Sequence, residues 1–191
     1  MAEIQKTYFY VVSGPSGSGK TSICRQIAAK YDWYYSVSHT TRTRRENEIN
    51  EQDYYFISTD EFKTMLDAQK FYEWAEVYGN YYGTAIDTIK SRLDKGVSVI
   101  ADVDTQGAAQ IKKKNPEAVS IFIETPGIDE LRKRLVQRGR DSSDEIQRRI
   151  KQAKAELAQK TEYDHIILND DFDDALKKFD AIIQQHTNGS K

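Results

Sequence analysis

The stretch Gly14-Pro15-Ser16-Gly17-Ser18-Gly19-Lys20-Thr21 decides the fold of this chain. It fits the pattern G-x-x-x-x-G-K-[ST], a loop whose backbone N–H groups surround phosphate oxygens. Residues 8–12 before it are aromatic or β-branched, which is typical of a buried strand, and residues 22–30 after it carry apolar side chains at helical spacing. The loop is therefore expected at a helix N-terminus, where the helix dipole favours an anion.

The side chains of this loop predict that it binds a nucleoside triphosphate. Lys20 is expected to reach the β- and γ-phosphates, and the Thr21 hydroxyl is expected to hold Mg²⁺. The plainer interpretation is a glycine- and serine-rich turn with a solvated lysine, but it leaves the complete pattern and its flanks unexplained. The motif alone does not identify the reaction.

Length and composition limit the class of protein. The chain has 191 residues, a formal net charge of −2, and 38% hydrophobic and 30% charged residues, as expected for one soluble domain with or without a small insertion. This charge argues against a nucleic-acid partner held by bulk positive charge, and no apolar run is long enough for a membrane span. The single cysteine, Cys24, is expected to be buried and reduced, which favours a cytoplasmic location.

Alternating strands and helices predict an α/β fold with a parallel sheet covered on both faces. Strands are expected at 8–12, 33–38, 97–104, 119–123 and 165–168, and helices at 22–30, 85–95, 128–136 and 174–184. Between them, strands at 53–57, 71–77 and 80–84 and a helix at 59–68, capped by Ser58 or Thr59, break the alternation. This part carries most of the tyrosines and is expected to form a small β-rich insertion.

Charged residues gather in three places near the expected phosphate site. Asp102 and Asp104 lie at the C-terminal end of the expected buried strand 97–104, at the edge where parallel sheets place their ligands; Asp104 has the alternative role of capping the next helix. Arginines are dense in the polar loop 40–48, where they are either solvated or directed at phosphate. A further set between 132 and 149 lies on an expected helix–turn–helix, with Ser142 to Glu145 capping its second helix.

Several segments in one order resemble the guanylate kinase family over nearly the whole chain. They are GPSGSGKT, SVSHTTRTRRENE, DYYF, YEWAEVYGNYYGT, ADVDTQG, RLVQRGRDS and ILNDD. The resemblance implies a three-layer P-loop NTPase fold with a parallel-sheet core (5–34 and 85–187). It also implies an inserted β-rich GMP-binding domain (about 35–84) and a helical lid (about 138–150). It further implies transfer of the γ-phosphoryl group of ATP to GMP, giving ADP and GDP, with Mg²⁺.

The resemblance also assigns roles to individual residues. Catalytic roles fall to Lys20, Arg42, Arg138 and Arg149. ATP would be bound by the loop residues Gly14, Pro15, Ser16, Gly17, Ser18, Gly19, Lys20 and Thr21, with Asn169 near the base. GMP would be bound by Ser38, Arg42, Arg45, Tyr54, Glu73, Tyr82, Thr84 and Asp104. Metal binding falls to Thr21 and, through water, to Asp102. Glu73 would accept hydrogen bonds from guanine N1–H and the 2-amino group, a pair of donors that adenine lacks.

Three positions depart from the family pattern R-x-P-R-x-G-E-x-x-G-x-D-Y in the GMP loop. Arg44 replaces the proline, Asn47 the first glycine and Glu51 the second. Asparagine tolerates a positive φ, whereas glutamate there carries about 1–2 kcal/mol of strain. The loop is expected either to keep its conformation with this strain or to relax and hold its arginines less firmly.

Two other functions remain open at this point. One is a nucleoside monophosphate kinase with another acceptor, against which Glu73 argues. The other is a non-catalytic binding module, against which the intact Lys20 and Thr21 argue. The expected partners are ATP and GMP, with dGMP as a second acceptor, and neither nucleic acid nor a membrane; the chain is expected to be a monomer or a homodimer.

Overall fold

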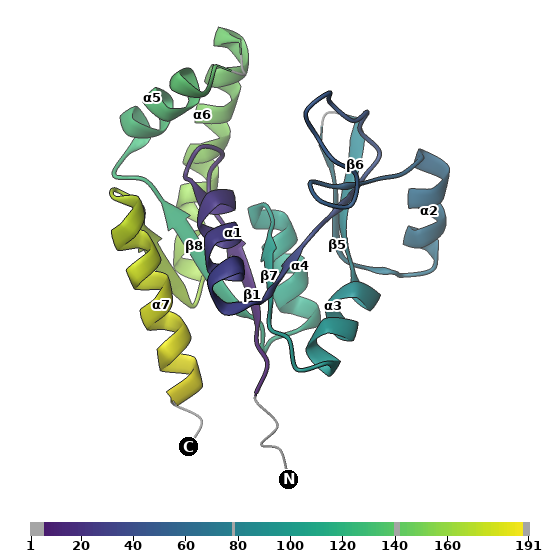
Figure 1. Ribbon diagram of the computed structural model, residues 1–191. Coiled ribbons are helices and arrows are strands. Elements are labelled where there is room, and N and C mark those ends of the chain that lie inside the picture. The colour runs from purple at the N-terminus through teal and green to yellow at the C-terminus, as the bar shows by residue number, and fades with distance from the viewer. Residues whose placement is uncertain (1–5, 78, 140–141, 189–191) are drawn as a thin grey trace.

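A five-stranded parallel sheet forms the centre of the computed structural model, which describes residues 6–77, 79–139 and 142–188 (Figure 1). The strand order is β2-β7-β1-β8-β9. The strands are β1 (Phe9–Ser13), β2 (Tyr34–Ser36), β7 (Val99–Asp102), β8 (Val119–Glu124) and β9 (His165–Leu168). This architecture confirms the expected α/β fold with a parallel core, and β1, which carries the phosphate loop at its end, is its central strand.

Helices cover both faces of this sheet. The side chains of Tyr10 and Val12 pack toward α1 (Lys20–Tyr31) and α7 (Phe172–Asn188). On the opposite face, Phe9 and Val11 share a cluster with residues of two further helices, α3 (Ile86–Asp94) and α4 (Thr105–Lys114). Every residue of β1 is therefore buried, as a strand covered on both faces requires.

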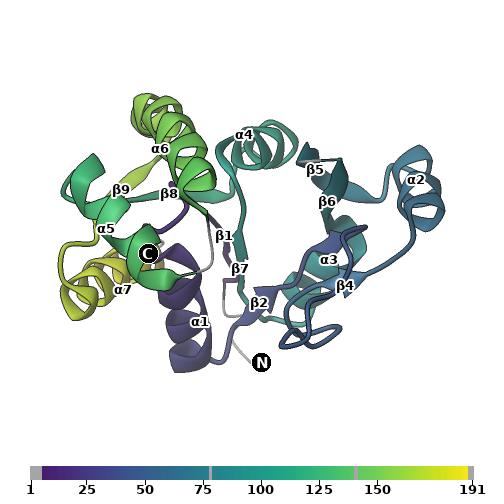
Figure 2. The same ribbon diagram turned by 90° about the horizontal axis from the view of Figure 1, so that it is seen from above.

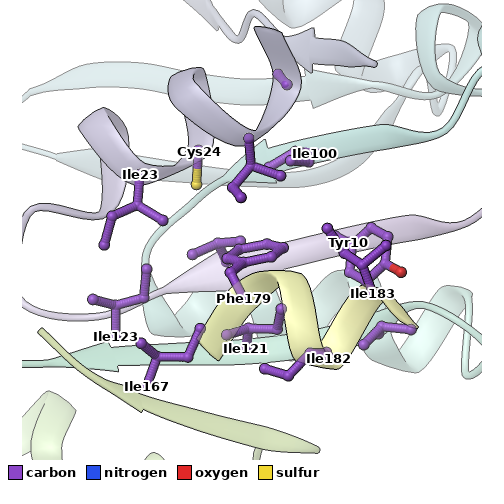
Figure 3. Close-up of a cluster of buried hydrophobic side chains, with 14 of the residues drawn as sticks. Tyr10, Ile23, Cys24, Ile100, Ile121, Ile123, Ile167, Phe179, Ile182 and Ile183 are labelled. Atoms are coloured by element: carbon purple, nitrogen blue, oxygen red, sulfur yellow. The ribbon is translucent and has the colours of Figure 1, made fainter. Parts of the chain in front are cut away.

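The larger cluster anchors α1 and α7 on one face of the sheet. Figure 3 shows Phe179 of α7 among isoleucines of α1 and of the sheet. Cys24 lies in the same cluster and is fully buried, as predicted. Burial also raises the pKa of its thiol, so this cysteine behaves as a small apolar side chain.

A second, four-stranded sheet stands beside the core, on the right of Figure 1. Its order is β4-β3-β6-β5, formed by β3 (His39–Thr40), β4 (Tyr55–Phe56), β5 (Phe71–Val77) and β6 (Asn80–Ala85). Helix α2 (Thr59–Asp67) packs on it through Phe62, whose ring centroid is 4.5 Å from that of Phe71. The Ser58 side chain caps α2 by a capping box with Glu61, so the first of the two expected caps is correct.

Three expected strands are shorter in the structure, and the one expected at 97–104 spans only Val99–Asp102. The strand expected at 33–38 is confined to Tyr34–Ser36, which pair with β7 in the core; the chain then crosses to the second sheet, where His39–Thr40 pair with β6. The chain passes between the two sheets at Val37 and Ser38. Of residues 53–57, only Tyr55–Phe56 form a strand: Tyr54 makes an isolated bridge with Asn50, and Asp53 lies in a turn where its backbone N–H donates to the Ile49 carbonyl at 3.0 Å. A local pattern cannot show where a chain changes sheet.

Two helices, α5 (Ile128–Arg138) and α6 (Ser143–Ala158), form a hairpin above one end of the core (Figures 1 and 2). They share their own apolar cluster, made by Leu131, Leu135, Ile146, Ile150 and Ala153. Gly139, at φ 64°, ends α5, and Ser142 caps α6 by a capping box with Glu145, as predicted. Residues 140 and 141 of the expected lid lie outside the described part of the chain. A 3₁₀ turn, η1 (Lys160–Glu162), leads from α6 to β9.

None of the helices within the described residues is both long and apolar enough to span a membrane.

Candidate active site

A cavity of about 600 Å³ opens where the core, the second sheet and the helical hairpin meet. Each part contributes side chains to its wall. They include Lys20 and Thr21 from the phosphate loop, Glu73 and Tyr82 from the second sheet, and Arg138 and Arg149 from the hairpin. Residues far apart in the sequence are therefore gathered around one space large enough for small-molecule ligands.

The phosphate loop is packed so closely that glycine is required at two of its positions. A Cβ atom on Gly14, at φ 145°, would lie 2.1 Å from the Ile123 carbonyl oxygen. A Cβ atom on Gly19, at φ 88°, would lie 2.4 Å from Nδ2 of Asn169. The loop ends at Lys20, where α1 begins, so its free N–H groups belong to a helix N-terminus.

Asn169 supports the phosphate loop through a hydrogen bond to its backbone. Its side chain is buried, and Nδ2 donates to the Ser18 carbonyl at 2.7 Å. The amide thus holds the backbone curve that would receive phosphate. The expectation that Asn169 lies near the ATP base stays a prediction, and its hydrogen bond to the loop is the role visible here.

Thr21 and Asp102 meet at the carboxyl ends of neighbouring parallel strands. The register of β1 with β7 places Val12 beside Asp102, and the Thr21 hydroxyl donates to Oδ2 of Asp102 at 2.5 Å. The Tyr35 hydroxyl lies 3.5 Å from the same oxygen, and burial, followed by the charge of Asp102, raises the pKa of Tyr35 well above its usual range. This local cluster offers oxygen ligands suited to a hard divalent cation.

The donor set fits a cation that keeps most of its own water. Among the described residues, no group of three or more His, Cys, Asp or Glu side chains gathers as a metal cage. Mg²⁺ is held in this way by one or two protein oxygens together with substrate phosphates. Thr21 and Asp102 are placed to supply those oxygens beside the phosphate loop.

Glu73 is a buried carboxylate at the opposite side of the cavity. Its exposure is 5%, and the Thr84 hydroxyl donates to Oε1 at 2.6 Å. Ser38 Oγ lies 3.3 Å from Thr84 Oγ1, so the two hydroxyls and the carboxylate form a short chain. Burial raises the pKa of Glu73 to about 7, and the hydrogen bond from Thr84 opposes this shift only in part.

A β-bulge turns Glu73 toward the cavity. The register of β5 with β6 shifts between Phe71 and Glu73. Phe71 stacks on Phe62 of α2, whereas Glu73, on the other side of the bulge, lines the cavity. In an uninterrupted strand these two residues would share a face, so the bulge is what separates the apolar anchor from the carboxylate.

The polar loop 40–48 carries an ion pair that was not expected from the sequence. Nη2 of Arg42 lies 2.8 Å from Oε1 of Glu48, and both side chains are 17% exposed. The other oxygen of Glu48 accepts from the Arg45 backbone N–H at 2.9 Å. The bond from Arg42 holds the pKa of Glu48 below its usual range. Glu48 thus orients Arg42, whose guanidinium also lies 5.5 Å from the centre of the Tyr54 ring.

The hairpin reaches the phosphate loop through Arg149. Its Nη1 donates to Ser16 Oγ at 2.8 Å, and Arg138 lines the same cavity. Glu156 of α6, which the sequence analysis also missed, is a buried carboxylate on this wall. Burial raises its pKa, and the charge of Lys20 opposes the shift. Glu156 follows Arg149 by seven residues and so lies on the same face of α6, a spacing that could have identified it from the sequence.

Asp104 caps helix α4. Its Oδ1 accepts from the Gly107 backbone N–H at 2.7 Å, as the alternative interpretation expected, while the residue also lines the cavity. Further expected residues on the cavity wall are Gly14, Ser16, Ser38, Arg42, Arg45, Tyr54 and Asp102. The wall also holds Arg25, Tyr35 and Asp53, which the sequence did not single out.

Glu51 keeps a left-handed backbone, with φ at 69°. Of the two outcomes expected for this loop, the structure therefore shows the strained one. The Glu51 backbone N–H donates to the Tyr54 carbonyl at 2.8 Å. Its side chain is exposed and makes no hydrogen bond or ion pair within the described residues that would offset the backbone strain. Replacing Glu51 with glycine should relieve this strain without changing the position of the arginines.

Glu51→Gly is expected to raise the free energy of unfolding by up to about 1 kcal/mol, because glycine avoids the left-handed penalty but loses more chain entropy. Glu51→Ala is the matched control, since it removes the same side chain and keeps the penalty. The measurement is urea unfolding of both variants and the parent. Equal stability of the glycine and alanine variants would show that the backbone at this position is not strained.

The raised pKa of Glu73 predicts a pH-dependent stability. Its protonation favours the folded state most fully below the ordinary carboxyl pKa of 4.5, and this contribution is lost as pH rises through about 7. Relative to Glu73→Gln, the parent should therefore lose about 1 kcal/mol of unfolding free energy between pH 6 and pH 8. Glu76→Gln, on the exposed face of the same strand, is the control. If the free energies of unfolding of the parent and of Glu73→Gln changed with pH in parallel, the raised pKa of Glu73 would be contradicted.

Comparison with known proteins agrees with this geometry. The guanylate kinase family model matches residues 6–186. A guanylate kinase from Shewanella oneidensis is 48% identical over 177 residues, covering 92% of this chain and 86% of that protein. One from Salmonella typhi is 49% identical over 178 residues, with the same two coverages.

A solved structure shows the same arrangement. The crystal structure of guanylate kinase from Anaplasma phagocytophilum superposes with a TM-score of 0.77 at 30% identity, covering 96% of this chain and 87% of that one. The family match spans the phosphate loop, the second sheet and the helical hairpin, which together surround the cavity. The chain therefore belongs to the guanylate kinase family.

Proposed function

We propose that this cavity is where the chain transfers the γ-phosphoryl group of ATP to GMP, giving ADP and GDP. The observation that carries the proposal is the placement of a complete phosphate loop and a buried carboxylate, Glu73, on opposite sides of one cavity. The loop suits the triphosphate donor, and the carboxylate suits the base of the acceptor. We further propose that the core binds ATP, the second sheet binds GMP, and α5 and α6 act as the lid.

ATP would lie with its phosphates along residues 14–21. Lys20 would contact the β- and γ-phosphates, and the loop N–H groups would surround the phosphate oxygens. Thr21 and Asp102 would hold Mg²⁺, Asp102 through water. When bound, Mg²⁺ neutralises charge on the β- and γ-phosphates. The hydrogen bond between these two residues keeps their oxygens together on the ATP side.

GMP would lie against the second sheet with its base at Glu73. One carboxylate oxygen already accepts from Thr84, and the remaining acceptor positions would meet guanine N1–H and the 2-amino group. Ser38 lies within the same hydroxyl chain. The phosphate of GMP would be held by arginine and phenol donors from the loop and the sheet. They are Arg42, Arg45, Tyr54 and Tyr82, all on the cavity wall.

Transfer would require positioning and charge neutralisation, without a covalent intermediate on the protein. An oxygen of the GMP phosphate would attack the γ-phosphorus of ATP while the bond to the ADP oxygen breaks. Arg138 and Arg149 would neutralise charge on the group in transit. Arg149 is already at the loop through Ser16, and closure of the hairpin would keep water from accepting the phosphoryl group.

A coupled ADP-release assay across GMP, dGMP, AMP, CMP and UMP tests the function. GMP is expected to be the best acceptor, with dGMP second. Lys20→Ala should lower turnover by about 10²–10³ because it removes a preorganised cation from the phosphates. Lys30→Ala, at the other end of α1, is the matched control and should leave turnover unchanged. A Lys20→Ala variant that keeps more than about a hundredth of parental turnover would contradict the assignment. Lack of ATP binding by the parent would instead favour a binding module.

Arg149→Ala should lower kcat by about 10²-fold and change the KM for GMP much less, because its contacts strengthen in the transition state. The neighbouring exposed residue offers the control, Arg148→Ala, which should resemble the parent. Steady-state kinetics with each nucleotide varied in turn measure both constants. A change confined to the KM for GMP would argue that Arg149 belongs to the acceptor site and not to the lid.

A further inference from the structure

Helix α4 of the core lies against β5, the edge strand of the second sheet that carries Glu73. Three of its residues face this strand: Gly107, Gln110 and Lys114. They fall at positions i, i+3 and i+7, so they form one stripe along the helix. Because β5 is an edge strand, its outer N–H and C=O groups have no neighbouring strand and need other partners.

Gln110 supplies those partners at the residue next to Glu73. Its Oε1 accepts from the Trp74 backbone N–H at 3.2 Å, and its Nε2 donates to the Trp74 carbonyl at 2.9 Å. A single side-chain amide thus pairs with both backbone groups of Trp74, as a neighbouring strand would. On the other side of the bulge, Lys114 Nζ donates to the Phe71 carbonyl at 2.9 Å. The backbone on both sides of Glu73 is therefore tied to α4.

Gly107 brings the helix backbone against the carboxylate itself. A Cβ atom at this position would lie 2.8 Å from Oε2 of Glu73 and 3.2 Å from its Cδ. On the opposite side, the Thr84 hydroxyl donates to Oε1 at 2.6 Å. The carboxylate thus lies between the core helix and β6, and the core helix limits where it can move.

We propose that Gln110 is a positioning residue for base selection: it acts through the backbone of β5 to fix the carboxylate of Glu73. The inference rests on the proposed function, since it takes Glu73 as the acceptor for guanine. Helix α4 begins directly after Asp104, two residues beyond Asp102 on the ATP side. The same core segment therefore sets the position of the base-binding carboxylate relative to the phosphate loop.

The test uses Gln110→Met in the full chain, because methionine keeps the length of the side chain and removes both hydrogen bonds. The KM for GMP should rise by roughly five- to thirtyfold, the size expected when a displaced carboxylate weakens its hydrogen bonds to guanine by about 1–2 kcal/mol. The KM for ATP should stay within about twofold of the parental value, since the phosphate loop is not in contact with Gln110. Lys113→Ala, an exposed neighbour on the same helix, is the matched control and should behave as the parent.

A selectivity measurement separates positioning from general damage. Inosine monophosphate has the N1–H of guanine but lacks the 2-amino group, so it uses fewer acceptor positions on Glu73. Gln110→Met should therefore lower the ratio of kcat/KM for GMP over inosine monophosphate. When Glu73 is already replaced by glutamine, Gln110→Met should change this ratio little further, because the carboxylate through which Gln110 acts is already absent.

Gly107→Ala provides a second variant with a different cause. Alanine is the better helix former, so α4 should not be weakened, but its Cβ would displace the carboxylate. The same selective rise in the KM for GMP is expected, which tests whether α4 limits the position of the carboxylate. If Gln110→Met does not fold, Gln110→Glu carries the test of Gln110 itself, because it keeps the acceptor for the Trp74 N–H and removes the donor to the Trp74 carbonyl; it should raise the KM for GMP by a smaller factor.

The outcomes distinguish this inference from the proposed function. A parent that does not prefer GMP over inosine monophosphate would overturn the guanine role of Glu73 and, with it, the inference. A parent with this preference and a Gln110→Met variant that retains it would overturn the role of Gln110 alone. An equal loss in the parental and Glu73→Gln backgrounds would also overturn it, because Gln110 would then act without Glu73.

Discussion

The parallel pairing of β1 with its two neighbours is the constraint on which the rest of the structure depends. Pairing with β7 places Val12 beside Asp102, and pairing with β8 brings the Ile123 carbonyl against Gly14. The first contact gathers the oxygens beside the phosphates, and the second leaves no room for a side chain at the start of the loop. A change of register in this sheet would separate both at once, whatever the loop sequence.

The charged groups on the two sides of the cavity differ in how far they are buried. On the side of the phosphate loop, Lys20 is partly exposed at a helix N-terminus. On the side of the second sheet, Glu73 is buried beside the Thr84 hydroxyl, and its burial works against its charge unless a ligand supplies matching donors. Guanine would supply those donors, and the burial that raises the carboxyl pKa also excludes the water that would compete for it.

The parts predicted from the sequence are those with a fixed local geometry. The phosphate loop, the alternation of strands and helices, an N-cap at Ser58 or Thr59 and the capping box at Ser142 follow from residue type and spacing. The bulge before Glu73 could not be predicted, because it depends on how β5 pairs with β6 and packs on α2. The pairing of Arg42 with Glu48 was missed for a similar reason, since a loop sequence does not show which of its charges meet.

The second sheet is joined to the core at adjacent points. The chain enters it at β3 and leaves it at β6, and these two strands pair directly, with His39 beside Gly83. The second sheet and α2 thus form one continuous insert whose ends lie side by side, an arrangement that tolerates exchange of whole segments. Exchange of the segment from β3 to β6, in evolution or by engineering, could therefore alter the acceptor in one step. The new edge strand would still have to pack against the same face of α4.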